Sequence, residues 1–522
     1  MPVITIMNMG LKGINTDMTN WDLPAEYITS GKNFRVFGNA IRATGGTADW
    51  SNVPASIGTA GHMHTAYWDQ TTSNVFLVAG TQGIYAFQGG GTIIDSGPYV
   101  GIDDDNVIDW QGTNLGSIAL MNHFNHFPLY WPSAQPSFPM SILPYDSTQT
   151  WQDVDRSCKV MRSHKSFLIA LNIRQGGNYY PNTFHWSHPA DINGIPPSWD
   201  YNDRDFLSGI AEIGGDAGKI IDGRSLRDEF AIYTENGISL LTESGDSFVF
   251  NLREMSSTIG LAAPNALVSV KGNHFFLGDD DILMNDGSQV SSIAHNKIRR
   301  GLANVVNTDK IKNSFALRHD QFKEIWFCVP EVGEDYATIA FVYNYKDDSW
   351  QIRDLIEPTI HAAQGTYGDA PKNWITWQGN WNQQTLNWTT RSRGVIDLTI
   401  AGIQDDTFRF LDPVGEAVTS GDLNAKIERI NFPLEGHEKV TTITRVYPHI
   451  EGKNPVKIQF GSQDSAYSDI RWKPAVVFTP GKDRKIDVRT TGELHCWRIE
   501  SIDQGRFNMS GMTIEYQMSG AR

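Results

Sequence analysis

The chain has 522 residues, of which 40% are hydrophobic, 11% aromatic and 20% charged, and it carries a formal net charge of -16. This composition is typical of an ordered, turn-rich globular protein and excludes a disordered or fibrous chain. The acidic charge disfavours a protein that grips duplex DNA, because like charges repel. No apolar run is long enough for a membrane-spanning helix, so we expect no membrane segment.

The N-terminal segment MPVITIMNMG has no basic residues and no long apolar core, so it does not predict a secretory signal. Cys158, Cys328 and Cys496 are odd in number and far apart in the chain. This spacing does not indicate a disulfide framework or a metal knuckle. We therefore expect synthesis and folding in a reducing cytoplasm.

Short apolar runs separated by turn residues dominate the first four fifths of the chain. Residues 74–89, 228–244 and 273–287 each predict a β-hairpin, and Asn236-Gly237 predicts a type I′ turn. Similar hairpins recur at intervals of about 44 to 67 residues. A four-stranded propeller blade needs roughly 40 to 50 residues. We therefore predict an all-β fold whose propeller-like body has about five to seven blades with insertions; two or three β-sandwiches in series are the alternative.

The pattern changes after Asp412. Residues 296–305 are the best candidate for a short helix before that point, and residues 413–424 are small and polar, as in a linker. About seven short alternating strands follow, a number typical of a β-sandwich. We predict a propeller-like body over 1–412, a linker over 413–424 and a C-terminal β-sandwich over 425–522.

The two predicted bodies differ in charge. Residues 425–522 contain 15 Lys and Arg against 12 Asp and Glu, which leaves 28 against 47 for residues 1–424. The acidic charge is therefore confined to the predicted body, and the C-terminal sandwich is better suited to docking on other proteins. Trp472 and Trp497 are candidate interface anchors, although the alternating strand around Trp497 favours a core position.

Motifs for catalysis, cofactors and metals are near misses. IGGDAGKI (213–220) lacks the first glycine and the Ser or Thr of a phosphate loop, so Gly214, Gly215 and Gly218 predict a surface turn. The chain has no GxSxG or HExxH motif. We therefore predict no enzyme activity, no catalytic or cofactor-binding residue and no cofactor.

Histidine pairs and acidic clusters are the remaining candidates for a metal site. The histidine pairs are His62 with His64, His123 with His126, and His185 with His188. The clusters are Asp103 to Asp105 and Asp279 to Asp281, and neither has the spacing of a dedicated calcium loop. Histidines that cap turns or face water, and aspartates in solvated hairpin turns, are the favoured interpretation, so we predict no metal site.

Residues 373–390 hold Trp374, Trp377, Trp381 and Trp388 among glycine, amide and threonine residues. Indole rings of this density can fill gaps between sheets or stack on sugar rings. Packing at a blade edge or crossing loop is the favoured interpretation, with sugar contact as the alternative.

Several segments together resemble the tail nozzle, or hub, proteins of short-tailed bacteriophages, including the packaged-DNA stabilisation proteins. These segments are TFHWSHPADINGIPPSW (183–199), the run from 228 to 302, YNYKDDSWQIRD (343–354), the Trp-rich segment and the C-terminal strands with the terminal GAR. They follow the order of that family over about residues 180–522. Glu493 and Leu494 depart from its more basic pattern.

The resemblance implies a structural virion protein rather than an enzyme. Such a protein is usually a homohexamer that closes the distal end of the tail below the adaptor, beside fibre, spike or needle proteins. It surrounds the channel through which genomic DNA passes without specific binding, helps to retain the packaged DNA and lets it pass at ejection. An acidic lumen fits this expectation, since it would not trap the duplex.

Two other function classes stay open. One is a glycan-binding or glycan-degrading propeller, such as a receptor-binding or depolymerase tail protein, whose tryptophans would stack on sugars. SQDSAYSDIRW (462–472) is only a degraded match to the turns of sialidase-type propellers. The other is an intracellular propeller scaffold with peptide partners.

Overall fold

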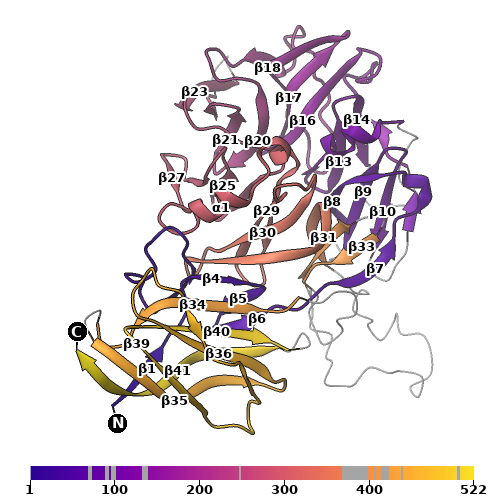
Figure 1. Ribbon diagram of the computed structural model, residues 1–522. Coiled ribbons are helices and arrows are strands. Elements are labelled where there is room, and N and C mark those ends of the chain that lie inside the picture. The colour runs from indigo at the N-terminus through magenta and orange to yellow at the C-terminus, as the bar shows by residue number, and fades with distance from the viewer. Residues whose placement is uncertain are drawn as a thin grey trace, which may run out of the picture.

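The computed structural model describes most of the chain, and it is mainly β-structure (Figure 1). The described residues are 2–68, 73–88, 93–95, 101–131, 139–245, 249–366, 398–404, 407–412, 423–436, 439–502 and 506–521. None of the helices in these ranges is long and apolar enough to cross a membrane. The predicted linker at 413–424 lies almost wholly outside the described residues, as does the Trp-rich stretch at 373–390.

Five four-stranded antiparallel sheets follow one another along the chain, each built from consecutive strands. The first contains β8 (Ala60–Trp68), β9 (Ser73–Gly80), β10 (Ile84–Gln88) and β11 (Ile93–Asp95). The second contains β12 (Gln111–Leu115), β13 (Ile118–His123), β14 (His126–Trp131) and β15 (Ser141–Ile142). The third contains β16 (Arg156–His164), β17 (Phe167–Gln175), β18 (Asn178–Trp186) and β19 (Gly209–Glu212). The fourth contains β20 (Ile220–Leu226), β21 (Glu229–Thr234), β22 (Ile238–Glu243) and β23 (Phe250–Ser256), and the fifth β24 (Leu267–Val270), β25 (Asn273–Leu277), β26 (Ile282–Asn285) and β27 (Val290–Ser292).

Two further blades share one long strand, β31 (Ser349–Thr366). Residues 349–354 of β31 pair with β30, while residues 361–366 pair with β32. The sixth blade therefore contains β28 (Phe315–His319), β29 (Glu324–Val329), β30 (Ala337–Asn344) and the first part of β31. The seventh contains the second part of β31, β32 (Leu398–Gln404), β33 (Thr407–Phe410) and β7 (Ala48–Asn52).

The seven blades close into a ring. Their first strands are neighbours in turn, from β8 through β12, β16, β20, β24 and β28 to the second part of β31, which contacts β8 again. The outer strand of the seventh blade, β7, comes from the N-terminal part of the chain and pairs with β33. The described residues thus form a seven-bladed β-propeller, within the predicted range of five to seven blades.

The hairpin β21 to β22 forms as predicted, but its turn is not type I′. Asn236 and Gly237 are absent from the residues with positive φ. The Thr234 hydroxyl instead accepts a hydrogen bond from Gly237 N at 2.9 Å. A Cβ atom at Gly237 would lie 2.9 Å from the Ser256 carbonyl oxygen, so close approach to β23 accounts for the glycine. The predicted short helix also forms, as α1 (Arg299–Val305).

The C-terminal strands build two packed sheets together with strands from the N-terminus. One sheet has the order β39 (Ile486–Gly492), β35 (Lys439–Gly452), β41 (Phe507–Ala521), β6 (Ala40–Ala43) and β5 (Phe34–Phe37), with β1 (Val3–Met7) also on β41. The other has the order β37 (Arg471–Trp472), β36 (Val456–Gln463), β40 (Leu494–Ser501), β34 (Lys426–Pro433) and β4 (Ser30–Lys32), with β38 (Val476–Phe478) also on β36. All seven predicted C-terminal strands are present in this sandwich.

The predicted division of the chain at residue 412 needs a correction. Residues 3–43 contribute β1, β4, β5 and β6 to the sandwich rather than to the propeller body. The pairing of β1 with β41 and of β4 with β34 joins segments about four to five hundred residues apart, and both chain ends lie on the sandwich (Figure 1). Short strands β2 (Gly13–Ile14) and β3 (Tyr27–Ile28) then run beside β31 and connect the sandwich to the propeller.

The sandwich and the propeller share one apolar core. Ile6 and Phe34 of the sandwich belong to the same cluster of buried side chains as Ile325 and Phe341 of the sixth blade. Trp350, at the start of β31, is fully buried, and its indole donates to the Ile293 carbonyl at 3.2 Å. The two parts therefore bury apolar surface against each other as the layers of a single domain do.

Candidate functional site

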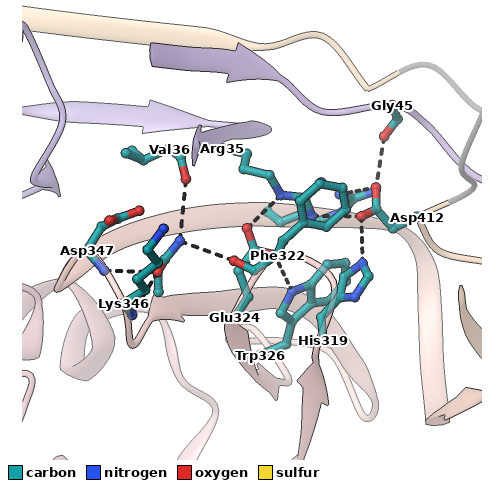
Figure 2. A network of polar contacts seen from close by, with 12 residues as sticks. Arg35, Val36, Gly45, His319, Phe322, Glu324, Trp326, Lys346, Asp347 and Asp412 are labelled. Atoms are coloured by element: carbon teal, nitrogen blue, oxygen red, sulfur yellow. Dashed lines mark hydrogen bonds and ion pairs between the residues drawn. The ribbon is translucent and has the colours of Figure 1, made fainter. Parts of the chain in front are cut away.

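A buried ionic network joins the sandwich to the propeller, and Figure 2 shows it from close by. Arg35 on β5 donates two hydrogen bonds to Glu324 on β29, at 2.6 and 2.9 Å. The same guanidinium donates to Asp412 at 2.7 Å and lies over the Phe322 ring at 3.5 Å. Arg35 is the only member of this network that comes from the sandwich, so its side chain ties strand β5 to the propeller.

Asp412 is the shared acceptor of the network. It also accepts from Arg353 Nη1 at 3.2 Å and from His319 Nε2 at 3.0 Å. Burial alone would raise the pKa of Asp412, but Arg35, Arg353 and His319 hold it well below its usual range. Two guanidinium groups thus face two carboxylates. We call Arg35, His319, Glu324, Arg353 and Asp412 the junction network.

A second buried network lies where the first strands of the blades surround the propeller axis. Arg162 on β16 forms a fork on Asp222 of β20, with distances of 2.9 and 2.8 Å. It also donates to the Gly112 carbonyl at 2.9 Å, to Gln111 Oε1 at 2.8 Å and to Asn265 Oδ1 at 3.3 Å. We call Arg162, Asp222, Gln111 and Asn265 the axial network. Burial would raise the pKa of Asp222, but Arg162 lowers it, so the carboxylate is ionised.

A small cavity of about 50 Å³ opens beside the axial network, at the end where the first strands begin. Its walls come from several blades and include Gly61 on β8, Lys159 on β16 and His361 on β31. Asn265, which accepts from Arg162, also lines it. The charged side chains at its rim are Lys159 with Asp109, 3.7 Å apart, and Lys312. The cavity is small and its lining is both polar and apolar. The Ser314 hydroxyl in its wall has no hydrogen-bond partner among the described residues, so it is not paired with His361 as a nucleophile with a base.

The predicted histidine pairs are not brought together into a metal site. The described residues contain no group of three or more His, Cys, Asp or Glu side chains that could hold a metal ion. His62 packs on the His361 ring with centroids 4.1 Å apart, and His64 Nε2 lies 3.1 Å from Asn114 Oδ1. Burial lowers the pKa of His64 to about 4 and that of His361 to about 3, so both are neutral at pH 7.

The other two pairs contact backbone groups. His123 Nε2 lies 2.8 Å from the Asn106 carbonyl and His185 Nε2 lies 2.7 Å from the Trp199 carbonyl. His126 Nδ1 lies 2.8 Å from the Phe127 carbonyl, and His188 Nδ1 accepts from Leu207 N at 2.9 Å. These histidines fasten loops, as predicted, but His123 and His185 are buried rather than facing water.

The acidic clusters are structural. Asp103, Asp104 and Asp105 are exposed, and the last two begin a 3-10 helix (Asp104–Asp109) rather than a hairpin turn. Asp279 to Asp281 form the predicted turn between β25 and β26. Asp281 is buried there and accepts from the Ser292 hydroxyl at 3.0 Å, while Asp280 pairs with Arg299 at 2.5 Å.

The remaining candidates also have packing roles. Gly214, Gly215 and Gly218 lie in the turn between β19 and β20, with no helix after it, so the segment is a surface turn as predicted. Trp497 is buried in the sandwich core, and the Arg498 guanidinium lies 4.6 Å from the ring of Trp472. The four tryptophans predicted to pack at 373–390 fall outside the described residues.

Comparisons with known proteins do not assign this chain to a family. No family model matches the chain, and no curated protein matches its sequence. Similar solved structures include virginiamycin B lyase from Staphylococcus aureus, with a TM-score of 0.41, 8% identity, and coverage of 70% of this chain and 99% of that one. The WD40 domain of Pan2 from Neurospora crassa gives a TM-score of 0.37 and 10% identity, with coverage of 74% and 99%.

A third similar structure is an exo-β-1,3-galactanase from Phanerochaete chrysosporium. Its TM-score is 0.28 at 7% identity, and the match covers 82% of this chain and 97% of that one. These low scores and identities carry no argument about the fold or the activity of this chain. The class of this protein therefore follows from its own strand pairings, which define a β-propeller fused to a β-sandwich.

Proposed function

We propose that this chain is a structural protein of a short bacteriophage tail. It would form the nozzle or hub ring at the distal end of the tail, below the adaptor, and guide DNA during ejection. The single observation that carries the proposal is the union of propeller and sandwich through one apolar core and a buried ionic network. A ring subunit that bears load needs such a union, because its docking surface and its channel wall must keep a fixed geometry.

The segments that carry the family resemblance support this proposal, because their side chains make hydrogen bonds and ring contacts that stabilise the blades. In the 183–199 segment, His185 contacts the Trp199 carbonyl, and the Trp199 ring packs edge-on against Trp151 with centroids 4.9 Å apart. In the 343–354 segment, the Tyr343 hydroxyl donates to Asp348 at 3.0 Å. These residues hold blades in place rather than assembling a reaction centre.

The charge distribution also supports a conduit. The propeller residues 44–412, counted without the sandwich strands, contain 24 Lys and Arg against 42 Asp and Glu. A channel wall built from this acidic propeller would repel the phosphate backbone and let the duplex slide. Attraction would instead slow the passage of the genome.

The first experiment is negative-stain imaging of the purified chain alone and mixed with the phage's adaptor. Our proposal predicts six-fold rings, with the adaptor on one face. A chain that stays monomeric in both samples, or that forms a trimeric fibre, contradicts it. The partners in the tail, the hexameric state and the virion location all depend on this result.

A glycan-binding propeller is the second candidate, and exposed aromatic side chains on and near the third blade favour it. Tyr179, Tyr180 and Tyr201 are 48%, 42% and 39% exposed. Aromatic faces of this kind can stack on sugar rings. A carbohydrate array tests the idea: strong binding that is lost in Tyr179→Ala and kept in the exposed control Ile192→Ala supports a glycan partner, and an empty array removes it.

A further inference from the structure

The cavity beside the axial network has polar groups without partners in its wall. Ser314, just before β28, is only 2% exposed, and its hydroxyl has no hydrogen-bond partner among the described residues. Asn313 also lines the cavity, and its Nδ2 donates to the Asp335 carbonyl at 2.7 Å. That bond fixes the amide, and its Oδ1 is buried without a partner. Buried polar groups in this state cost stability, so a polar ligand in the cavity would be held by them.

The same wall also carries positive charge. Lys159 on β16 lies 3.7 Å from Asp109, which is too long for a hydrogen bond, and Lys312 is exposed at the rim. His361 is neutral at pH 7, because burial lowers its pKa to about 3. Its Nδ1 accepts from Met63 N at 3.4 Å, so Nε2 carries the ring proton and can donate. Two lysines and one aspartate give the wall a formal net charge of +1.

The size and the apolar part of the wall restrict the ligand further. The apolar side chains in the wall are Ile108, Pro264, Phe315 and Ile360. The volume of about 50 Å³ holds about three to five water-sized groups. A ligand that fits is therefore small, carries one negative charge and has some hydrocarbon. Phosphate and sulfate lack hydrocarbon, whereas a carboxylate on a short carbon chain meets all three conditions.

We propose that this cavity binds a short hydroxycarboxylate of two or three carbons. The carboxylate accepts from Lys159, from the Ser314 hydroxyl and from His361 Nε2, and hydrogen bonds to a charged acceptor are the strong ones. The hydroxyl of the ligand donates to Asn313 Oδ1, and its carbon chain packs against Phe315. This site belongs to the single chain and does not depend on the ring assembly of the proposed function.

The test compares four forms of the full chain. They are wild type, Lys159→Gln, Ser314→Ala and the control Lys482→Gln, which removes an exposed lysine of the sandwich. Thermal unfolding is measured at pH 7 and constant ionic strength in chloride, glycolate, acetate and phosphate. Isothermal titration then gives the dissociation constant of each anion.

We expect glycolate to raise the unfolding temperature of wild type and Lys482→Gln above the value in chloride. The dissociation constant should be at least about tenfold weaker in Lys159→Gln and in Ser314→Ala, as for the loss of one hydrogen bond to a charged group. In chloride, Ser314→Ala should unfold at the same or a higher temperature than wild type, because a buried hydroxyl without a partner has been removed. This result separates a lost site from a lost fold.

Acetate and phosphate test the chemistry of the ligand. Acetate lacks the hydroxyl that donates to Asn313, so it should bind about threefold more weakly than glycolate, and phosphate more weakly still. Acetate or phosphate that binds as tightly as glycolate would overturn the proposal. Equal unfolding temperatures of wild type in glycolate and in chloride would mean that water alone fills the cavity, and an equal shift in wild type and Ser314→Ala would place the binding elsewhere. Either result would also overturn it.

Discussion

Arg35 shows how one side chain can hold two parts of a protein together. Its guanidinium satisfies Glu324 and Asp412 at the same time, and all three side chains are at least nine-tenths buried. An intact buried ion pair of this kind stabilises the fold little more than an apolar contact would. Its disruption lowers the free energy of unfolding strongly, because the remaining charges are buried without a partner and without water.

We expect Arg35→Met to lower the free energy of unfolding by about 3–5 kcal/mol, because Glu324 loses its cationic partner and keeps only the Trp326 indole, and Asp412 loses one of two guanidinium groups. Chemical denaturation measures the change. The control is Arg471→Met, which breaks an exposed pair with Asp464 at 2.5 Å and should cost less than about 1 kcal/mol. Equal losses in the two variants would contradict a role for the junction network in stability.

Buried histidines give the fold a defined pH dependence. Burial lowers the pKa of His64, His274 and His495 to about 4 and that of His185 and His361 to about 3. In the unfolded chain these groups titrate near pH 6.5. The unfolded state therefore binds more protons as the pH falls below 6.5, and the folded state loses stability down to the folded pKa values.

We expect the free energy of unfolding to fall between pH 7.5 and pH 5, by up to about 2 kcal/mol for each such histidine. Denaturation curves at the two pH values check the sign. His185→Gln should flatten the dependence by the share of one histidine. A stability that is unchanged or higher at pH 5 would contradict the neutral state of these side chains.

At the scale of elements, strand β7 closes the propeller through an aromatic contact. Trp50 on β7 stacks on Phe410 of β33 with ring centroids 5.1 Å apart, and it packs edge-on against Phe76 of β9 at 5.3 Å. The indole of Trp50 therefore contacts both the seventh blade and the first blade. Ring closure depends on this contact and on the backbone pairing of β7 with β33.

Trp50→Ala should lower the free energy of unfolding by about 3–5 kcal/mol, the usual cost of removing a large packed aromatic side chain. Ile192→Ala is the control, because Ile192 is 95% exposed. Hydrogen exchange adds a local measurement: protection should fall most in β7, β33 and β8. A uniform loss across all blades would argue that Trp50 does not act at the closure.

Local sequence patterns were sufficient to predict most elements. Alternation and turn residues predicted the hairpins, the C-terminal strands and helix α1, because these features depend on neighbouring residues. The turn at Asn236-Gly237 escaped prediction because contact with β23, rather than backbone preference, sets its geometry. The location of residues 3–43 in the sandwich was also not predicted. Strand β4 pairs with β34 across about four hundred residues, and no local sequence pattern indicates that pairing.

The buried polar groups were equally hidden in the sequence. Arg162 shares strand β16 with Arg156 and Lys159, and Asp222 shares β20 with Arg224. The two partners are 60 residues apart, and nothing in either strand identifies the other as a partner. A charged residue directly after apolar neighbours in a strand, as Asp222 follows Ile220 and Ile221, is the signal that could have marked a buried charge, since such a residue must find a partner when buried.

For the whole molecule, the shared core predicts a single cooperative unit. The sandwich takes strands from both chain ends, and its core continues into the blades. Differential scanning calorimetry should therefore give one unfolding transition. A spectroscopic signal from Trp497 of the sandwich and one from Trp326 of the sixth blade should change at the same temperature. Two separate transitions would mean that the sandwich and the propeller are stable independently.

A rigid subunit of this kind suits a ring assembly, which is the central claim of the proposed function. Mass photometry of the chain mixed with its adaptor tests that claim most directly. In the mixture with the adaptor we predict a species that contains six copies of the 58.3 kDa chain. A mixture that contains only single 58.3 kDa chains would contradict it.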